Sequence, residues 1–389
     1  MRCIFLSLIL FLLTAFTSAA EPHQQDKLRL RGYIKLMPGL QLDKDFSDPA
    51  FNQLLHHRLN VRWDITDNVD LRIEGRNRLM YNELFDGVPG LKELFEQDAG
   101  LVDMSWVWLA DGSWIGHSEV DRLYLSWRTD NWRVRMGRQR VNWGINLVSN
   151  PNDLFNTYSF FDFDYEERPG ADALRVQHFL GRLSSIELAV SPARSDRNTV
   201  AAIKYAHNWR AYDIQLISGY FRDRLALGGG WAGHLGGAGF KGEATWFYDL
   251  EKHSGRSRGN MVAAAGLDYM FPRGTFAILE FLYNGGYQRA AGSDDPTLMI
   301  TEPLRPDNIM FSEFAITLSA DKVFSPLVSG GVAFMVLPDI EAAFVMPRFS
   351  YSLGTNLDFE LVAQIFAGGE ETIFEEAGSR FFGVLKYAM

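Results

Sequence analysis

Four arginines stand within eight positions in the stretch "WRVRMGRQRVNWG" at residues 132–144: Arg133, Arg135, Arg138 and Arg140. A guanidinium group stays charged, and its planar fork can hold a carboxylate or a phosphate through two parallel hydrogen bonds. Apolar and aromatic residues separate these arginines, as in a strand with one apolar face. The stretch therefore indicates anion-binding groups on an element that has one dry side and one wet side.

Basic side chains continue on one face of the neighbouring segments. In the first five segments that read as strands, this face carries Lys27, Arg29, Arg31, Lys35, Arg58, Arg62, Arg72, Arg76, Arg78, Arg122, Arg128, Arg133 and Arg135. The acidic residues on the same face are mainly Asp64, Asp70 and Glu74. Fixed Arg and Lys lower the barrier for anions in a pore and raise it for cations. With Arg138 and Arg140 added, these residues are the predicted lining of an anion pathway.

A second interpretation of the same basic face remains open. The arginines can instead pair with loop carboxylates that fold against them, and the acidic run at residues 162–167 offers such partners. The two interpretations are compatible, because an acidic loop facing a basic wall forms a constriction.

Catalytic and metal-binding patterns are weak. The eight histidines are scattered, and His56 and His57 point to opposite faces of one predicted strand, so they cannot share a metal. The sequence has no glycine-rich phosphate loop and no nucleophile elbow. We predict no catalytic residue, no metal site, no cofactor and no enzymatic activity. A barrel enzyme acting on lipid would need a serine beside a histidine on a lipid-facing wall, and the sequence identifies no such pair.

The elements that position the arginines alternate in hydrophobicity with a period of two. In "KLRLRGYIKL", Leu28, Leu30, Ile34 and Leu36 share one face, while basic residues and Tyr33 share the other. Eighteen such segments follow one another, near residues 26–37, 54–65, 69–80, 119–128, 132–143, 171–179, 183–191, 199–206, 209–220, 226–235, 238–249, 259–271, 275–285, 309–319, 324–336, 341–351, 357–367 and 380–389.

Short and long connectors alternate between these segments. Segments of about ten residues with one apolar face, short turns at one end and long loops at the other are typical of a transmembrane β-barrel. Trp63, Trp127, Trp132, Tyr205 and Trp209 lie beside the short turns, where an aromatic girdle is expected. We predict an all-β, antiparallel, up-and-down barrel of 16–18 strands, with eighteen as the best estimate. The alternative is a secreted soluble β-sandwich, whose strands are usually shorter.

The chain begins with a predicted signal peptide, residues 1–20, and residues 21–389 form one predicted domain. An apolar run from Ile4 to Leu13 is followed by small residues, with Ser18 and Ala20 before the cleavage site. Cys3 is the only cysteine. The predicted location is the cell outer membrane after export through the inner membrane. A net charge of −10 argues against nucleic acid as a partner.

Two long connectors contain features of their own. Residues 144–170 hold an aromatic cluster of Phe155, Tyr158, Phe160, Phe161, Phe163 and Tyr165. Such a cluster must pack on something, either inside the barrel as a constriction or over its mouth as a lid. Residues 81–118 contain "LKELFEQ", which is able to form a short helix, and the tryptophan-rich "WVWLADGSW".

Arg138 and Arg140 have the opposite parity to Arg133 and Arg135. A β-bulge at Gly137 would reverse the phase and return Arg138 and Arg140 to the wet face. Alternatively, the strand has already left the bilayer at residue 138, and both arginines are simply in water.

The stretches "VRMGRQRVNWG", "NPNDLFN" and "ERPGADALRV" resemble the strand, loop and strand of outer-membrane porin-like barrels of the alginate-export type and related uncharacterised families. The resemblance covers roughly residues 27–180. It implies an eighteen-strand monomeric barrel, sometimes with an arginine-rich lumen that conducts an acidic polysaccharide. Arg133, Arg135, Arg138 and Arg140 are the residues that it marks as pore-lining. The final segment "RFFGVLKYAM" is similar to the signal that the barrel assembly machinery reads, although it ends in Met where such strands usually end in Phe.

The expected function is passive passage of small or oligomeric anionic solutes, including oligosaccharides, with outer-membrane lipid and the assembly machinery as partners. The alternative is a plugged barrel that acts as a scaffold or as a receptor for a partner or a surface polysaccharide.

Overall fold

The computed structural model describes residues 27–86, 88, 90–96, 98, 100–156, 160–161, 164, 170–251, 258–287, 304–369, 372–375 and 377–389. The predicted signal peptide lies outside the described residues. The strands are β1 (Leu28–Leu42), β2 (Pro49–Thr66), β3 (Val69–Asn82), β4 (Ser105–Asp111), β5 (Trp114–Arg128), β6 (Trp132–Gln139), β7 (Ala171–Phe179), β8 (Ser184–Ser191), β9 (Val200–Trp209), β10 (Tyr212–Phe221), β11 (Arg224–Leu235), β12 (Ala238–Asp249), β13 (Asn260–Met270), β14 (Thr275–Asn284), β15 (Phe314–Ser325), β16 (Val328–Leu337), β17 (Ala342–Gly354), β18 (Leu357–Ala367) and β19 (Ser379–Ala388).

The described helices are short: η1 (Glu83–Phe85), α2 (Leu91–Glu96), η2 (Asp196–Asn198) and η3 (Pro338–Ile340). The short helix expected in "LKELFEQ" is therefore confirmed as α2. Among the described residues, no helix has the length and apolar character needed to cross a bilayer.

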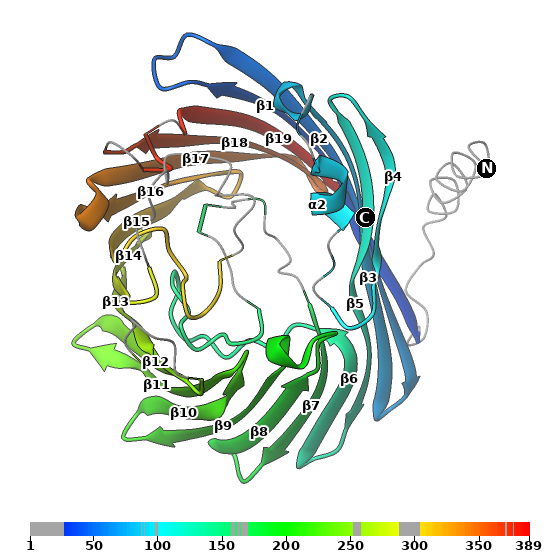
Figure 1. The fold of residues 1–389 in the computed structure, drawn as a ribbon, viewed down its shortest axis with the longest axis vertical. Coiled ribbons are helices and arrows are strands. Elements are labelled where there is room, and N and C mark those ends of the chain that lie inside the picture. The colour runs from blue at the N-terminus through cyan, green and yellow to red at the C-terminus, as the bar shows by residue number, and fades with distance from the viewer. Residues whose placement is uncertain are drawn as a thin grey trace.

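All strands belong to one antiparallel sheet that closes on itself, because β1 pairs with both β2 and β19 (Figure 1). Strand β3 pairs directly with β5, so β4 stands outside the closed order and eighteen of the nineteen strands form the wall. The predicted barrel and its strand number are confirmed. Within this wall each of the eighteen strands pairs on both sides, as a sheet in hydrocarbon requires.

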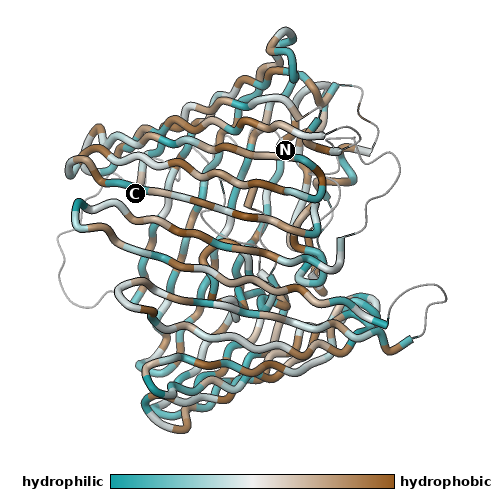
Figure 2. Tube along the Cα trace, turned by 90° about the vertical axis from the view of Figure 1, so that its left-hand side faces the viewer, coloured by the Kyte–Doolittle hydropathy of each residue, from teal (hydrophilic) through white to brown (hydrophobic). Residues whose placement is uncertain are grey.

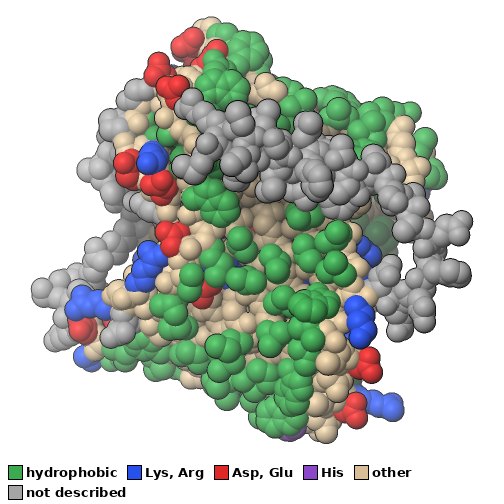
Figure 3. Space-filling view, turned by 90° about the vertical axis from the view of Figure 1, so that its right-hand side faces the viewer, with side chains coloured by type: hydrophobic (Ala, Val, Ile, Leu, Met, Phe, Trp, Pro, Cys, Tyr) green, Lys and Arg blue, Asp and Glu red, His purple; other side chains and the backbone are tan. Residues whose placement is uncertain are grey.

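The wall has an apolar outer face because every second side chain points outward. On β15, Phe314, Ile316 and Leu318 are exposed, whereas Ala315 and Thr317 between them are buried. Hydrophobic residues recur along all the strands (Figure 2), and Figure 3 shows them spread across the wall with charged side chains mainly toward its two ends. The aromatic residues expected at the short turns, Trp63, Trp127, Trp132, Tyr205 and Trp209, are all exposed on this outer face.

The sequence did not predict β4, and the structure corrects the limits of two strands beside it. The "WVWLADGSW" stretch is not a loop but a hairpin, in which β4 pairs with the first part of β5. Strand β5 begins at Trp114 and β6 ends at Gln139, so β6 is four residues shorter than the expected 132–143. Because β6 ends early, β4 takes its place beside β5 at the long-loop end of the wall.

A hydrophobic core lies inside the barrel, on the side of β7–β18. It joins wall residues such as Phe247, Met335 and Phe344 to residues of three long connectors, among them Trp143, Met310 and Phe374. The connectors after β6, β14 and β18 therefore fold inward at their described residues, and their ribbons lie within the ring of strands in Figure 1.

Candidate solute pathway

The basic residues predicted between Arg29 and Arg135 alternate with outward apolar residues on β1–β3, β5 and β6. We call the inner face of these strands and of the neighbouring β7 the basic wall. On β6, Arg133 and Arg135 are half-buried and alternate with Trp132 and Met136, whose side chains are exposed on the outside. On β2, Arg58 is 1% exposed, whereas its outward neighbours Leu55 and Trp63 are 41% and 46% exposed. Strand alternation alone explains how so many charges avoid lipid.

Several of these residues lie at the short-turn end of the barrel, where the strands leave the membrane. Lys27, Arg29, Arg31 and Arg128 are all exposed there. Arg29 donates to Asp64 at 2.5 Å, and Asp64 also accepts a hydrogen bond of 2.9 Å from Arg62. These charges therefore lie at the entrance of the lumen.

Deeper in the basic wall, most arginines are held by carboxylates of the wall itself. Arg58 donates to Asp121 at 2.5 Å and to Glu74 at 3.0 Å. Arg76 donates to Glu119 at 2.6 Å, and its Nε lies 3.3 Å from Asp121. Three other arginines of the wall also have partners. Nε of Arg72 lies 3.6 Å from a carboxylate oxygen of Asp70, and Nη2 of Arg78 lies 3.0 Å from Nδ1 of His117. Arg122 donates a hydrogen bond of 2.9 Å to the Asp121 carbonyl.

A β-bulge at Asp121 makes these contacts possible. The pairing of β3 with β5 shifts register between Glu74 and Gly75, which leaves Asp121 as an extra residue in β5. The side chain of Asp121 is fully buried and reaches both Arg58 and Arg76. The sequence carried no evident signal for this bulge.

Lys35 is held by the only described residue of the 162–167 acidic run. Asp164 forms an ion pair with Lys35, and one of its oxygens lies 3.8 Å from Nδ1 of His56. The other members of that run, residues 162–163 and 165–167, lie outside the described residues. For Lys35, a loop carboxylate does fold against the basic wall.

Arg133 and Arg135 differ from the other arginines of the wall. Each lies over an aromatic ring, with its Cζ 5.7 Å from the Phe179 centroid and 5.4 Å from the Tyr124 centroid, respectively. Within the described part of the chain, neither forms an ion pair with a carboxylate. Arg175 stands directly opposite Arg135 on β7, which adds a third guanidinium to the same patch.

Arg175 and Lys204 were not among the predicted lining residues, because the predicted basic face ended with the fifth strand segment. Both share the inner face of their strands, and alternation within 171–179 and 199–206 would have found them. Glu187 neutralises them in part, since it accepts bonds of 2.6 and 2.9 Å from Arg175 and lies 3.8 Å from Lys204.

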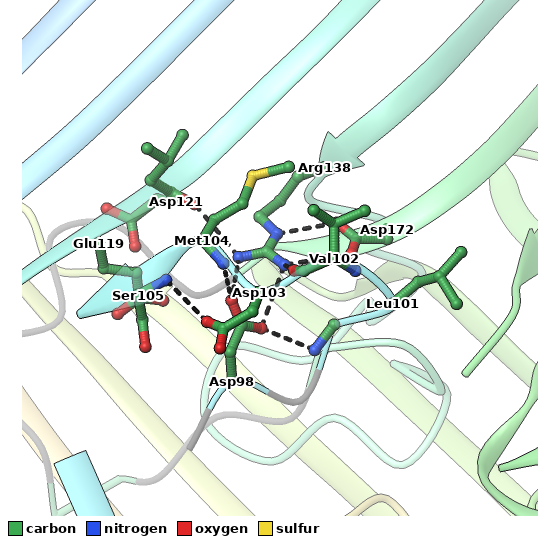
Figure 4. Close-up of polar contacts among 12 residues, drawn as sticks. Asp98, Leu101, Val102, Asp103, Met104, Ser105, Glu119, Asp121, Arg138 and Asp172 are labelled. Carbon is green, nitrogen blue, oxygen red and sulfur yellow. Dashed lines mark hydrogen bonds and ion pairs between the residues drawn. The ribbon is translucent and has the colours of Figure 1, made fainter. Parts of the chain in front are cut away.

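Arg138 is enclosed in the wall instead of facing the passage (Figure 4). Its side chain is 3% exposed and donates to Asp172 at 2.8 Å, to Asp98 at 2.7 Å and to the Val102 carbonyl at 2.6 Å. Asp172 stands opposite Arg138 on β7, and Asp98 precedes β4. The guanidinium therefore fastens the start of β4 to the point where β6 ends.

The bulge predicted at Gly137 is absent. Tyr124 pairs with Gly137 and Leu123 with Arg138 without a shift in register. Gly137 instead has a φ of +120°, and a Cβ there would lie 2.2 Å from the Leu123 carbonyl oxygen, so only glycine fits. The alternative, that Arg138 is simply in water, is also wrong because Arg138 is buried. Arg140 lies just beyond β6 and is half-buried.

The connector that follows β6 crosses the lumen and is tied to the far wall; we call its described part, residues 140–156, 160–161, 164 and 170, the inward loop. Glu280 on β14 accepts hydrogen bonds from the backbone N–H groups of Ser149 at 2.7 Å and Val148 at 3.2 Å. Glu243 on β12 accepts one from Ile145 at 2.7 Å. Wall carboxylates thus replace the water that a loop backbone would otherwise bind.

Polar side chains of other strands hold the same loop. Gln215 on β10 donates to the Trp143 carbonyl at 2.7 Å, and the Trp143 indole donates to Glu187 at 2.5 Å. Gln364 on β18 donates to the Phe161 carbonyl at 2.6 Å. The described residues between 143 and 161 of the inward loop therefore follow the β8–β18 side of the barrel, whereas Asp164 reaches the basic wall at Lys35.

The aromatic cluster of this loop packs inside the barrel and not over its mouth. Phe161 contacts Phe344, Phe366 and Phe374, with ring centroids between 5.3 and 6.2 Å apart. Phe160 packs on Phe344, and Phe155 packs edge-on against Trp143. Tyr158, Phe163 and Tyr165 lie outside the described residues.

The outer wall carries a serine and a histidine on the same face, as a lipid-acting enzyme would require. Ser118 donates to Asn77 at 2.7 Å, and the Asn77 amide lies 3.2 Å from Nδ1 of His57. Asn77 therefore stands between the hydroxyl and the imidazole. Because a nucleophile needs direct contact with its base, this row does not form a catalytic pair. Among the residues the structure describes, no group of three possible metal ligands is present.

No family model matches this chain, and no curated protein matches it. Solved structures match over almost its whole length. OprD of Pseudomonas aeruginosa, an outer membrane protein, aligns with a TM-score of 0.59 and 9% identity over 94% of each chain. A BenF-like porin from Pseudomonas fluorescens Pf-5 aligns with a TM-score of 0.59 and 11% identity, and the alignment covers 93% of this chain and 98% of the porin. OccAB4 of Acinetobacter baumannii aligns with a TM-score of 0.57 and 8% identity, and the alignment covers 95% of this chain and 100% of OccAB4.

This chain has the fold of an outer-membrane porin. The comparison supports the predicted porin-like barrel fold. It does not support the alginate-export type in particular, because the matched structures are porins of the OprD and Occ group. At sequence identities near 10%, structural similarity establishes the fold only. The solute must be inferred from the residues that line the lumen.

Proposed function

We propose that this barrel is a channel for the passive passage of small or oligomeric anionic solutes. The observation that carries the proposal is the contrast along the basic wall. Arg58, Arg76 and Arg138 are neutralised by nearby carboxylates, whereas Arg133 and Arg135 face the lumen over aromatic rings without such a partner among the described residues.

Uncompensated guanidinium groups on a partly desolvated wall attract anions more strongly than paired ones. Two unit charges about 4 Å apart interact by ~1 kcal/mol in water but by ~4 kcal/mol at the effective dielectric constant near a protein surface. The proximity of Arg175 adds to the positive potential, although Glu187 offsets part of its charge. No covalent step and no cofactor enters this function.

The test is ion selectivity in planar bilayers. The Arg133→Glu/Arg135→Glu variant is expected to reverse or abolish the preference for chloride over potassium, because it changes the sign of the uncompensated charge. The matched control is Arg182→Glu/Arg273→Glu, which makes the same change in charge at two exposed short turns. Selectivity that stays unchanged in the first variant would remove these arginines from the pathway.

A plugged scaffold or receptor is the second candidate, because three inward connectors pack a hydrophobic core within the lumen. Deletion of residues 150–168 discriminates between the two. A channel is expected to conduct before the deletion and to conduct more after it, since the inward loop narrows the passage. A barrel that conducts in neither form is a scaffold. We further propose that the assembly machinery binds β19, which closes the barrel against β1.

A further inference from the structure

Four polar side chains form a hydrogen-bonded row across the outer face of β2–β5. The Trp108 indole on β4 donates to Ser118 at 3.1 Å, and the Ser118 hydroxyl donates to Asn77 at 2.7 Å. The Asn77 amide lies 3.2 Å from Nδ1 of His57. Ser118, Asn77 and His57 stand directly opposite one another on β5, β3 and β2. We call these four residues the outer polar row.

The outer polar row lies on the side of the wall that faces lipid. On β2, His57 alternates with His56 and Arg58, which are buried on the inner face. It shares its own face with Leu55, which is 41% exposed. Polar groups are costly beside hydrocarbon unless they are hydrogen-bonded, so a row of them at this place requires a reason.

The hydrogen bonds of the row have one direction, which fixes the tautomer of His57. Asn77 accepts from Ser118 through Oδ1, so the Nδ2 amino group of Asn77 is the donor that faces His57. Nδ1 of His57 therefore accepts, and the imidazole proton is on Nε2. Within the described residues, Nε2 has no hydrogen-bond partner. The row thus ends in one unused donor on the lipid side of the barrel.

The height of His57 on the wall indicates what can accept this hydrogen bond. Nine residues separate His57 from Thr66, where β2 ends at a short turn. At about 3.3 Å per residue and a tilt of about 40°, His57 lies ~23 Å above that turn, and the apolar band of a transmembrane barrel is about 25 Å tall. The oxygen atoms that join lipid headgroups to acyl chains lie at this boundary. A bilayer lipid therefore carries the acceptor that Nε2 lacks.

Tryptophan side chains of the β4–β5 hairpin extend the row on its long-loop side. The six-membered ring of Trp108 lies against Gly116, because a Cβ on Gly116 would be 2.5–2.6 Å from three of its atoms. Trp108 is still 47% exposed, and Trp106 is 44% exposed. The Trp114 ring lies 5.0 Å from the ring of Tyr81. Open indole rings at the membrane boundary beside hydrogen-bonding groups suit sugar rings, whose C–H faces pack on aromatic rings.

We propose that the outer face of β2–β5 binds a membrane lipid that has a sugar headgroup. Nε2 of His57 donates a hydrogen bond to an oxygen atom where the headgroup joins the acyl chains, and the sugar rings pack on Trp106 and Trp108. The acyl chains lie along the apolar outer side chains between the row and the short turns. Because this site is outside the barrel, the inference is independent of the proposed passage of anions through the lumen.

Native mass spectrometry of the full barrel in detergent micelles tests the site with two probes, lipid A and phosphatidylethanolamine. Lipid A is an acylated disaccharide and is expected to bind more tightly. His57→Leu is expected to weaken the binding of lipid A roughly three- to tenfold, because one hydrogen bond is lost. The matched control is His178→Leu. His178 pairs with the outward-facing Trp132 at the short-turn end, with ring centroids 4.1 Å apart, and its replacement should leave lipid A binding unchanged.

A second variant, Trp106→Leu/Trp108→Leu, tests the contact with the sugar rings. It is expected to remove the preference for lipid A over phosphatidylethanolamine, because leucine keeps an apolar surface but offers no flat ring. Trp63→Leu/Trp127→Leu makes the same change beside the short turns and should keep the preference.

Three outcomes would overturn the proposal. The first is equal binding of the two lipids by the unchanged protein, a comparison that requires no variant to fold. The second is lipid A binding that keeps its full strength in His57→Leu. The third is a dimer of barrels without bound lipid that His57→Leu dissociates, because a second copy of the chain would then cover the row.

Discussion

Arg135 and Arg138 are three residues apart on β6 and have opposite surroundings. Arg135 faces the lumen over Tyr124, while Arg138 is enclosed by two carboxylates and backbone carbonyls. An arginine whose charge is fully matched gives a solute nothing to bind, however close it lies to the passage. At the residue scale, the partner of each arginine therefore matters more than the number of arginines.

Replacing Arg138 by Ala should destabilise the barrel strongly. The change leaves Asp98 and Asp172 facing each other at a buried site without their cation, and breaking a buried pair in this way costs about 3–5 kcal/mol. Unfolding by urea in lipid vesicles measures the loss. The control Arg348→Ala removes a more exposed pair with Asp321 and should cost only about 0–1 kcal/mol. Similar losses in both variants would contradict the role assigned to Arg138.

The contact of Asp164 with the basic wall should depend on pH. Burial alone raises the pKa of this carboxyl group, but the nearby His56 side chain and the Lys35 ammonium outweigh burial and hold the pKa below its ordinary value of 3.8. The contact is therefore complete above the ordinary value and is lost as pH falls through the lowered one. Channel current should become larger or noisier as pH falls below about 4.

The Asp164→Asn variant isolates this effect from other groups that titrate in acid. It removes the titrating carboxyl group, so the change in channel current at acid pH should disappear. If the change persists in the variant, another group causes it.

At the scale of elements, the inward loop depends on strands far from it in sequence. Glu243 and Glu280 lie on β12 and β14, are almost fully buried, and bind backbone N–H groups of residues 145–149. Alternation within those segments places both glutamates on the inner face. It cannot reveal that they bind a loop about a hundred residues earlier, because no local pattern records a contact between segments so distant.

Replacing Glu280 by Gln should loosen this loop. The amide keeps the size of the side chain but turns one acceptor into a donor that faces a backbone N–H group, and leaving a buried donor without a partner costs about 1–3 kcal/mol. Single-channel recordings should then show a higher mean conductance and more frequent fluctuations. Glu313→Gln, a change at an exposed residue before β15, serves as the control. Identical records from both variants would show that Glu280 does not restrain the loop.

The sequence predicted features that repeat and missed features that occur once. Alternation, even strand number and exposed aromatic residues at the short turns recur around the barrel, so each segment supports the others. The bulge at Asp121, the substitution of β4 for β6 and the clamp at Arg138 are single local events. Parity assigns a residue to a face, but it does not give the carboxylate that neutralises it. For this reason, the position of the basic wall could be predicted from the sequence. Which of its arginines have no carboxylate partner among the described residues could not be predicted.

For the molecule as a whole, the orientation of alternate side chains can be tested with two neighbouring residues. Leu318 on β15 is 51% exposed and points outward, whereas Ser319 points into the lumen. Leu318→Arg places a charge against hydrocarbon and should cost about 2–4 kcal/mol near the middle of the bilayer, while Ser319→Arg meets water and should cost little. Reversible unfolding in lipid vesicles compares the two variants, which introduce the same side chain one residue apart.

Only a closed barrel with lipid outside and water inside predicts the larger penalty at Leu318. In a soluble sandwich, the outward site would meet water and the inward site would lie in the core. A larger penalty at Ser319 than at Leu318 would therefore overturn the orientation of the whole wall.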